Sequence, residues 1–132
     1  MTSKVTYKGN LRTECEHIQS KSKFITDAPL DNKGKGEAFS PTDTVATALA
    51  SCMITTMGIK ANEHDLDIKG TFAEVTKHML ANPRRISKID VVMNIKGELT
   101  DKDKTFLENV AKTCPVIQSI HPDIIKDIIF KY

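Results

Sequence analysis

The chain has 132 residues, of which 39% are hydrophobic and 27% charged, and its formal net charge is +2. This length favours a single domain that is large enough to bury one hydrophobic core. The small net charge, with basic residues spread along the chain, argues against a nucleic-acid-binding surface, so we expect no nucleic-acid partner.

We expect neither a secretion signal nor a membrane span. Residues 1–5 contain no apolar h-region. The longest weakly polar run, residues 45–59, is interrupted by threonine and serine and falls short of about 18 consecutive apolar residues. Three cysteines cannot all pair within one chain. The sequence therefore predicts a reducing, cytoplasmic location, in which cysteines are buried, metal-bound or reactive rather than joined in structural disulfides.

The first third of the chain predicts a small sheet followed by a loop. In the sheet, a turn at Gly9–Asn10 joins the first two strands, and period-two alternation puts Leu11 and Cys15 on one face of the second strand and Arg12 on the other. Residues 31–37, which contain two glycines and several charges, predict a loop. The three expected strands span residues 4–8, 10–18 and 22–27.

A long helix is expected next. Ser40 is a good N-cap, Pro41 suits the first helical position, and Asp43 completes a capping box, so the helix begins here and extends to about Asn62. Small residues dominate its first half and larger apolar residues its second half. Because the segment is apolar almost all round, we expect a buried central helix.

The second half of the chain predicts further strands around one more helix. Thr100 and Asp103 form a capping pair that opens an amphipathic helix, which ends near Cys114 because the residue before a proline disfavours helical geometry. The order of elements predicts an α+β fold with antiparallel sheets packed on the long central helix. The expected strands span residues 66–77, 85–97 and 124–132, the first two joined by a turn around 81–83.

The cysteines have several interpretations. Cys52 falls in the middle of the long helix and is either a nucleophile that needs a nearby cation or a small core residue. Cys114 precedes Pro115 and either caps a short helical turn over residues 115–120, whose free amides would favour a thiolate, or is a buried helix-terminal residue. These two cysteines are 62 positions apart (114 minus 52), so only the fold could bring them together. Cys15 is expected to be a core residue or a bystander.

Arg12 is of interest because arginine is scarce: the chain has three arginines among 19 basic residues. A guanidinium is always charged, and its fork matches a thiolate or the two oxygens of a peroxide better than an ammonium group does. Arg12 also shares a strand face with Glu14 and Glu16, so a solvated charged surface is the alternative.

Metal and hydrolase chemistry have weaker support. The spacing of Cys114 and His121 is not that of a zinc site, and neither His64 nor His78 has a helical partner ligand four residues away. We therefore expect no metal. A Cys–His hydrolase dyad, with His121 beside Cys52 or Cys114, remains an alternative.

The segment 40–52, together with Cys114-Pro115-Val116 and Ser119-Ile120, resembles the OsmC/Ohr family of thiol-dependent peroxide reductases. The likeness covers nearly the whole chain, including the opening strand hairpin with Arg12. It implies a single OsmC-like domain over residues 1–132 and an interlocked homodimer with its active sites at the subunit interface. It implies no cofactor, whether metal, haem or flavin.

The resemblance also assigns roles to individual residues. Cys52 matches the family's peroxidatic cysteine, Cys114 its resolving cysteine, and Arg12 the arginine that polarises the thiolate. In the organic hydroperoxide branch, a glutamate ten positions before the peroxidatic cysteine anchors that arginine. Thr42 occupies this place here, and the nearest acid is Asp43, so the chain is more similar to a general OsmC-like member.

The activity implied by the resemblance is reduction of peroxides in oxidative-stress defence, through a sulfenic acid and then a Cys52–Cys114 disulfide. A lipoylated protein or a small dithiol would reduce the disulfide. Organic hydroperoxides would be preferred if an apolar pocket is lined by Phe39, Met53, Ile54 and Met57. The alternatives are a non-catalytic dimer that senses oxidants or binds a small apolar ligand, and a structural domain with inert thiols.

Overall fold

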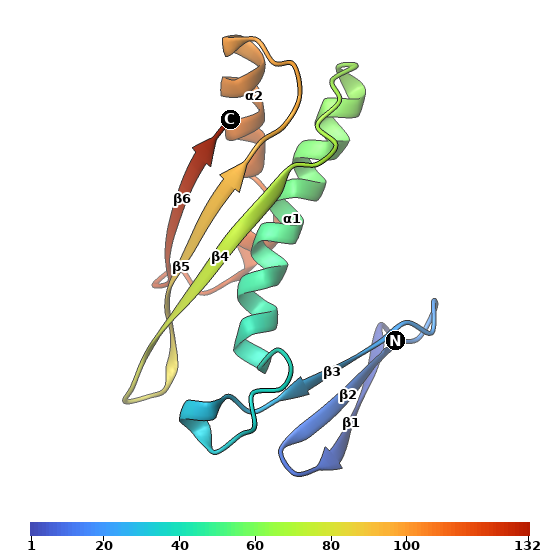
Figure 1. Ribbon diagram of the computed structural model, residues 1–132, viewed down its shortest axis with the longest axis vertical. Helices are drawn as coiled ribbons and strands as arrows, with labels where there is room; N and C mark the ends of the chain where they lie inside the picture. Colours follow the sequence, from blue (N-terminus) through green and yellow to red (C-terminus); the bar gives the residue numbers. More distant parts are fainter. The chain divides into compact units, whose positions relative to one another are not determined.

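The computed structural model describes residues 1–132 and confirms the α+β class (Figure 1). The contacts within the chain divide it into two compact units, Met1–Val45 and Ala46–Tyr132. The strands are β1 (Ser3–Gly9), β2 (Arg12–His17), β3 (Lys23–Asp27), β4 (Phe72–Leu80), β5 (Arg85–Asn94) and β6 (Ile125–Lys131). The helices are the 3-10 turn η1 (Leu30–Asn32) and the α-helices α1 (Pro41–Glu63), α2 (Asp101–Ala111) and α3 (Pro115–Ser119).

The first unit contains an antiparallel sheet in the order β1-β2-β3. The turn between β1 and β2 uses Asn10 and Leu11, both at positive φ (54° and 62°), which suits the twist of a tight hairpin. The Leu11 amide also donates to the hydroxyl of Tyr7 at 3.3 Å. The predicted turn was therefore one residue too early, and Leu11 belongs to the turn rather than to a strand face.

The loop predicted over residues 31–37 is folded tightly onto the end of β3. The amides of Gly34 and Gly36 donate to the carbonyls of Pro29 (2.9 Å) and Ala28 (3.2 Å). A Cβ atom at position 34 would come within 1.7 Å of the Ala28 carbonyl oxygen, so only glycine fits here. This close packing brings Glu37 to the end of β3.

The first unit has no apolar core. Its buried residues are Thr26, Asp27 and Ser40, all of them polar. The apolar side chains Val5 and Phe24, which lie on one face of the sheet with Cys15 between them, are 62% and 54% exposed. A three-stranded sheet becomes stable when one of its faces packs against something else.

Helix α1 begins at the predicted capping box. The Ser40 hydroxyl accepts a hydrogen bond from the Asp43 amide (3.1 Å), and the Asp43 carboxylate accepts one from the Ser40 amide (2.9 Å). Pro41 occupies the first helical position, where its missing N–H costs nothing. The predicted helix is confirmed to within a residue at its C-terminal end.

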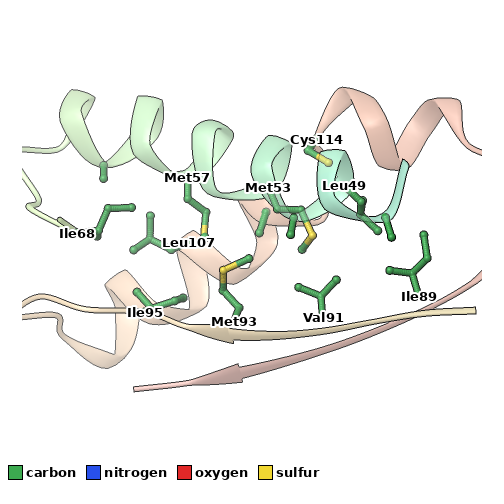
Figure 2. Packing of buried hydrophobic residues seen from close by; sticks show 14 residues of the cluster. Leu49, Met53, Met57, Ile68, Ile89, Val91, Met93, Ile95, Leu107 and Cys114 are labelled. Carbon is green, nitrogen blue, oxygen red and sulfur yellow. The ribbon is translucent and has the colours of Figure 1, made fainter. Parts of the chain in front are cut away.

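In the second unit, the core lies between one side of α1, the inner face of the β4-β5-β6 sheet, and α2 (Figure 2). The helix contributes buried residues at the three- and four-residue spacing of a single face, and the larger of them, Leu49, Met53 and Met57, are completely buried. Its other side is not covered in the single chain, as Ile59 is 54% exposed. The expected buried core helix is confirmed for the face of α1 that packs in the core, whereas the opposite side is exposed in the single chain. The largest fully buried side chains are Leu49, Met53, Met57, Ile89, Val91, Met93, Ile95 and Leu107.

By length and composition alone, α1 would also qualify as a membrane span. Core helices of globular proteins meet the same criterion. Because Leu49, Met53 and Met57 are completely buried against the sheet and α2, we interpret α1 as a core helix.

The second sheet has the order β4-β5-β6 and is mixed rather than antiparallel throughout. Strands β4 and β5 are antiparallel, as expected, whereas β5 and β6 are parallel. Between β5 and β6 the chain passes through α2 and α3, and such a helical crossover returns it to the end of the sheet from which β5 began. The expectation of purely antiparallel sheets was wrong for this pair.

Strand β4 begins at Phe72, six residues after the predicted start. The preceding residues form a turn, in which the Lys69 amide donates to the Asp67 carboxylate (2.9 Å) and the Thr71 amide to the Ile68 carbonyl (3.0 Å). Gly70 has φ +89°, which interrupts an extended strand. The predicted capping box of α2 is confirmed: the Asp103 amide donates to the Thr100 hydroxyl (3.1 Å), and the Asp103 carboxylate accepts from the Thr100 amide (2.9 Å).

Candidate active site

Cys114 is completely buried at the start of α3. It has extended backbone geometry, as expected before Pro115, and it is the N-cap of this short helix. The Ile117 amide donates to the Cys114 sulfur at 3.4 Å. The predicted capping of a short turn by Cys114 is confirmed, and so is the burial of the residue. The expectation that the free amides favour a thiolate was wrong, because burial raises the pKa of the thiol.

Cys114 and Cys52 are neighbours. Burial raises the pKa of the Cys114 thiol above its ordinary value, and a hydrogen bond and a charge interaction with Cys52 raise it too. The amides of Ile117 and Val116 act in the opposite direction. The fold thus brings together two cysteines that are 62 positions apart in the sequence.

Cys52 lies at the border of the core. It follows the exposed Ser51 and precedes the fully buried Met53 on α1, and its own side chain is half-buried against the core cluster. Its backbone carbonyl accepts a hydrogen bond from the Thr56 hydroxyl at 2.8 Å. Of the two neighbouring thiols, Cys52 is therefore the one that a molecule from solvent can reach.

Arg12 belongs to the first unit, where its guanidinium binds the buried carboxylate of Asp27. Nε and Nη2 of Arg12 lie 2.7 and 2.8 Å from the two carboxylate oxygens of Asp27. Nη2 also contacts Glu37 at 3.3 Å. The hydrogen bonds from Arg12 hold the pKa of Asp27 below its usual range, and the same contacts raise the pKa of Arg12.

The neighbouring glutamates on β2 do not bind Arg12. Lys23 lies 3.3 Å from Glu14 and 3.4 Å from Glu16, and Lys21 lies 3.8 Å from Glu16. Glu14 and Glu16 therefore belong to a solvated charged surface. This was the alternative considered for Arg12. Arg12 itself is one-third exposed and is held at two points.

Asp43, the acid nearest to the position from which the family's glutamate anchors the arginine, accepts a hydrogen bond from the Ser40 amide in the capping box of α1. The carboxylates bound to Arg12 are Asp27 and Glu37, which the sequence analysis did not identify. The signal for Asp27 was present in the strand register: Arg12 at the start of β2 stands opposite Asp27 at the end of β3. Glu37 gave no such signal, because it reaches Arg12 only through the fold of its loop.

A polar pocket of about 220 Å³ lies beside Arg12. This polar pocket is not the apolar pocket expected from the sequence. Met53 and Met57 are completely buried in the core (Figure 2), so these two side chains cannot line an open site. Phe39 is 55% exposed. The residues that line the polar pocket are Lys8, Gly9, Asn10, Arg12, Asp27 and Lys35.

The remaining candidates from the sequence are a metal site, His121 and Cys15. No group of three or more histidine, cysteine, aspartate or glutamate side chains is placed to hold a metal ion. The Nδ1 atom of His121 accepts a hydrogen bond from the Asp123 amide at 3.1 Å. Cys15 is half-buried on β2, beside a pocket of about 630 Å³ that Val5 and Phe24 also line.

The family of the chain follows from comparison with known proteins. Several solved structures with below 20% identity share its α+β arrangement, which identifies the fold as that of OsmC and organic hydroperoxide resistance proteins. The family profile described as OsmC-like protein matches residues 34–126, which is most of the chain. The protein belongs to the OsmC family. A search of curated proteins finds no match.

Three solved structures illustrate the similarity. A protein of Psychrobacter arcticus 273-4, provisionally described as an osmotic stress induced and detoxification response protein, is 57% identical, with a TM-score of 0.95 over 98% of this chain and 95% of that one. A Legionella pneumophila protein described as organic hydroperoxide resistance protein OsmC is 18% identical (TM-score 0.78, 100% and 98% covered). The organic hydroperoxide resistance protein OhrB of Bacillus subtilis is 19% identical (TM-score 0.70, 99% and 98% covered).

Proposed function

We propose that the protein is a thiol-dependent peroxidase that reduces hydroperoxides, with Cys52 as the peroxidatic and Cys114 as the resolving cysteine. The observation that carries the proposal is the contact between a reachable Cys52 and a buried Cys114. Membership of the OsmC family supports it, as do relatives that are described as organic hydroperoxide resistance proteins. These descriptions favour organic hydroperoxides as substrates.

In the first step, the Cys52 thiolate attacks the terminal oxygen of the hydroperoxide. A sulfur–oxygen bond forms and the oxygen–oxygen bond breaks, so that Cys52 becomes a sulfenic acid and an alkoxide leaves. The alkoxide takes up a proton and departs as the alcohol. A cation beside the leaving oxygen lowers the barrier to this step, and this is the role we assign to Arg12.

In the second step, the Cys114 sulfur attacks the sulfenic sulfur of Cys52. A disulfide forms, the sulfur–oxygen bond breaks, and the hydroxyl leaves as water with the proton of Cys114. An external dithiol, either a small molecule or a lipoylated protein, then supplies two electrons by thiol–disulfide exchange and restores both thiols. No metal or organic cofactor enters this cycle.

The working form that we propose is a cytoplasmic homodimer with its active sites at the subunit interface. Two exposed apolar surfaces support this assembly. One is the face of the first unit's sheet, which has no apolar core to pack against, and the other is the side of α1 that carries exposed apolar residues such as Ile59. The role proposed for Arg12 requires its guanidinium to reach a Cys52 thiolate in this assembly. Asp43 would contribute by capping the helix that carries Cys52.

The test is sustained peroxide consumption with excess dithiol. The wild-type protein is expected to consume many equivalents of cumene hydroperoxide, Cys52→Ser none, and Cys15→Ser as many as wild type. Consumption that stops after one equivalent would contradict catalysis and favour an oxidant sensor. Undiminished consumption by Cys52→Ser would remove Cys52 from the mechanism.

A further inference from the structure

We infer that Asp27 is the residue that positions Arg12, by holding its guanidinium in one orientation and leaving a single edge free for the reacting groups. This inference rests on the proposed function, since it concerns the same arginine. It assigns to Asp27, and in a lesser way to Glu37, the anchoring of the arginine that a glutamate at the place of Thr42 provides in the organic hydroperoxide branch.

The geometry of the pair is that of a two-point clamp. Nε and Nη2 of Arg12 each donate to a different oxygen of Asp27, at 2.7 and 2.8 Å. A bidentate pair of this kind fixes the plane of the guanidinium as well as its distance. The contacts of Arg12 are made by Nε and Nη2 alone, which leaves Nη1 without a protein partner.

Asp27 is itself held rigidly. It stands opposite Arg12 in the β2–β3 register, and its amide donates to the Phe39 carbonyl at 3.0 Å. The Glu37 backbone also donates to the Asp27 carboxylate. With only 4% of its side chain exposed, Asp27 cannot turn towards water without breaking these contacts.

The other ion pairs on this sheet provide a contrast. Lys23 is half-exposed, and it reaches Glu14 and Glu16 through one nitrogen at 3.3 and 3.4 Å. Pairs of this kind contribute little and change partners readily. A buried carboxylate is costly unless it is paired, so Asp27 depends on Arg12 as much as Arg12 depends on Asp27.

The two-point clamp by Asp27 determines which part of the Arg12 guanidinium can bind a ligand. Arg12 and Asp27 both line the polar pocket of about 220 Å³, whose other charged residues are Lys8 and Lys35. The charge of Lys35 also acts on Asp27 and contributes to lowering the pKa of its carboxyl group. A guanidinium that is already oriented towards such a space needs no reorganisation when negative charge develops on a thiolate or a leaving oxygen.

The experiment compares Asp27→Asn and Asp27→Glu with Glu14→Gln, which removes a carboxylate from the same sheet without touching Arg12. Two quantities are measured on the full-length protein: the single-turnover rate of Cys52 oxidation by cumene hydroperoxide, and the pH midpoint of Cys52 alkylation by iodoacetamide. We expect Asp27→Asn to slow oxidation by about 10- to 100-fold and to raise the alkylation midpoint, because the cation is no longer held in place. Asp27→Glu should recover part of the rate, and Glu14→Gln should match wild type.

The direction in which the pH midpoint of Cys52 alkylation shifts distinguishes positioning of Arg12 from a simple charge effect of Asp27. If Arg12 stays in place when the Asp27 charge is removed, the net positive charge near the thiolate increases and the midpoint falls. A lower midpoint, or a rate equal to wild type in Asp27→Asn, would overturn the inference. If Asp27→Asn does not fold, a wild-type rate in folded Asp27→Glu would overturn it.

Failure of this inference can be distinguished from failure of the proposed peroxidase function. If the wild-type protein consumes no peroxide, the peroxidase proposal fails, but the alkylation midpoints still compare the thiolate in the three variants. Unchanged midpoints in active, folded Asp27 variants would reject the role of Asp27 alone.

Discussion

Cys52 and Cys114 are in contact, yet Cys114 is completely buried while Cys52 is only half-buried. In the mechanism that we propose, this difference sets the order in which the two thiols react. A solvent-borne oxidant would meet Cys52 first, and Cys114 would then attack the product. Burial raises the pKa of the Cys114 thiol, which disfavours its thiolate.

The first prediction concerns thiol labelling. A raised pKa means that the Cys114 thiolate forms only at a pH above the ordinary cysteine range, so iodoacetamide should modify Cys52 well before Cys114 at neutral pH. Raising the pH should bring Cys114 into reaction. Peptide mass mapping at a series of pH values measures both rates, with Cys15 as an internal comparison. Equal labelling of Cys52 and Cys114 at neutral pH would contradict the buried setting of Cys114.

The second prediction concerns acid stability. The pKa of Asp27 is lowered by Arg12, so their interaction stabilises the fold fully above the unfolded aspartate pKa of about 4 and is lost as the pH falls through the lower folded value. The stability difference between wild type and Asp27→Asn should therefore shrink below about pH 4. Thermal melts from pH 7 down to pH 3 measure this difference. A difference that stays constant with pH would show that the Asp27 charge contributes nothing.

The third prediction concerns the core of the second unit. Met53 is fully buried between α1 and the sheet, so Met53→Ala removes apolar contacts and leaves a cavity, at a cost of about 2–5 kcal/mol in the free energy of unfolding. Ile125→Ala, on a side chain that is 62% exposed, should cost about 1 kcal/mol or less. Urea denaturation measures both, and equal costs would argue against the packing of α1 on this sheet.

The fourth prediction concerns the loop after β3. Gly34→Ala would place a Cβ atom 1.7 Å from the Ala28 carbonyl oxygen, so the loop must move, at a cost of about 1–3 kcal/mol. Because this loop carries Glu37, the variant should also weaken the support of Arg12 and slow the oxidation of Cys52 moderately. Gly58→Ala, where a Cβ meets nothing within 4 Å, is the matched control for stability. A Gly34→Ala protein as stable as wild type would show that the loop is not packed as described.

The local features of the fold were predictable because each depends on residues close in sequence. The two capping boxes, at Ser40 with Asp43 and at Thr100 with Asp103, mark the starts of α1 and α2 directly. Cys114 before Pro115 likewise marks the end of one helix and the start of another. The late start of β4 was missed because Ile68 is an apolar residue that reaches the core from a turn rather than from a strand.

The features that the sequence could not provide depend on pairings between distant segments. The parallel pairing of β5 and β6 is decided by how α2 and α3 cross over, which residue periodicity does not encode. The bond between Arg12 and Asp27 requires the β2–β3 register, and Glu37 requires the folded loop. Asp43 was the nearest acid to the expected position, but its carboxylate accepts a backbone amide at the start of α1.

The most direct test of the central claim is a thiol and mass analysis after one equivalent of cumene hydroperoxide is added to the fully reduced protein. We predict the loss of two free thiols and of two hydrogen atoms in mass, with a Cys52–Cys114 disulfide in the peptide map and Cys15 still free. A disulfide that joins any other pair, or a stable Cys52 sulfinic acid with Cys114 still reduced, would contradict the account.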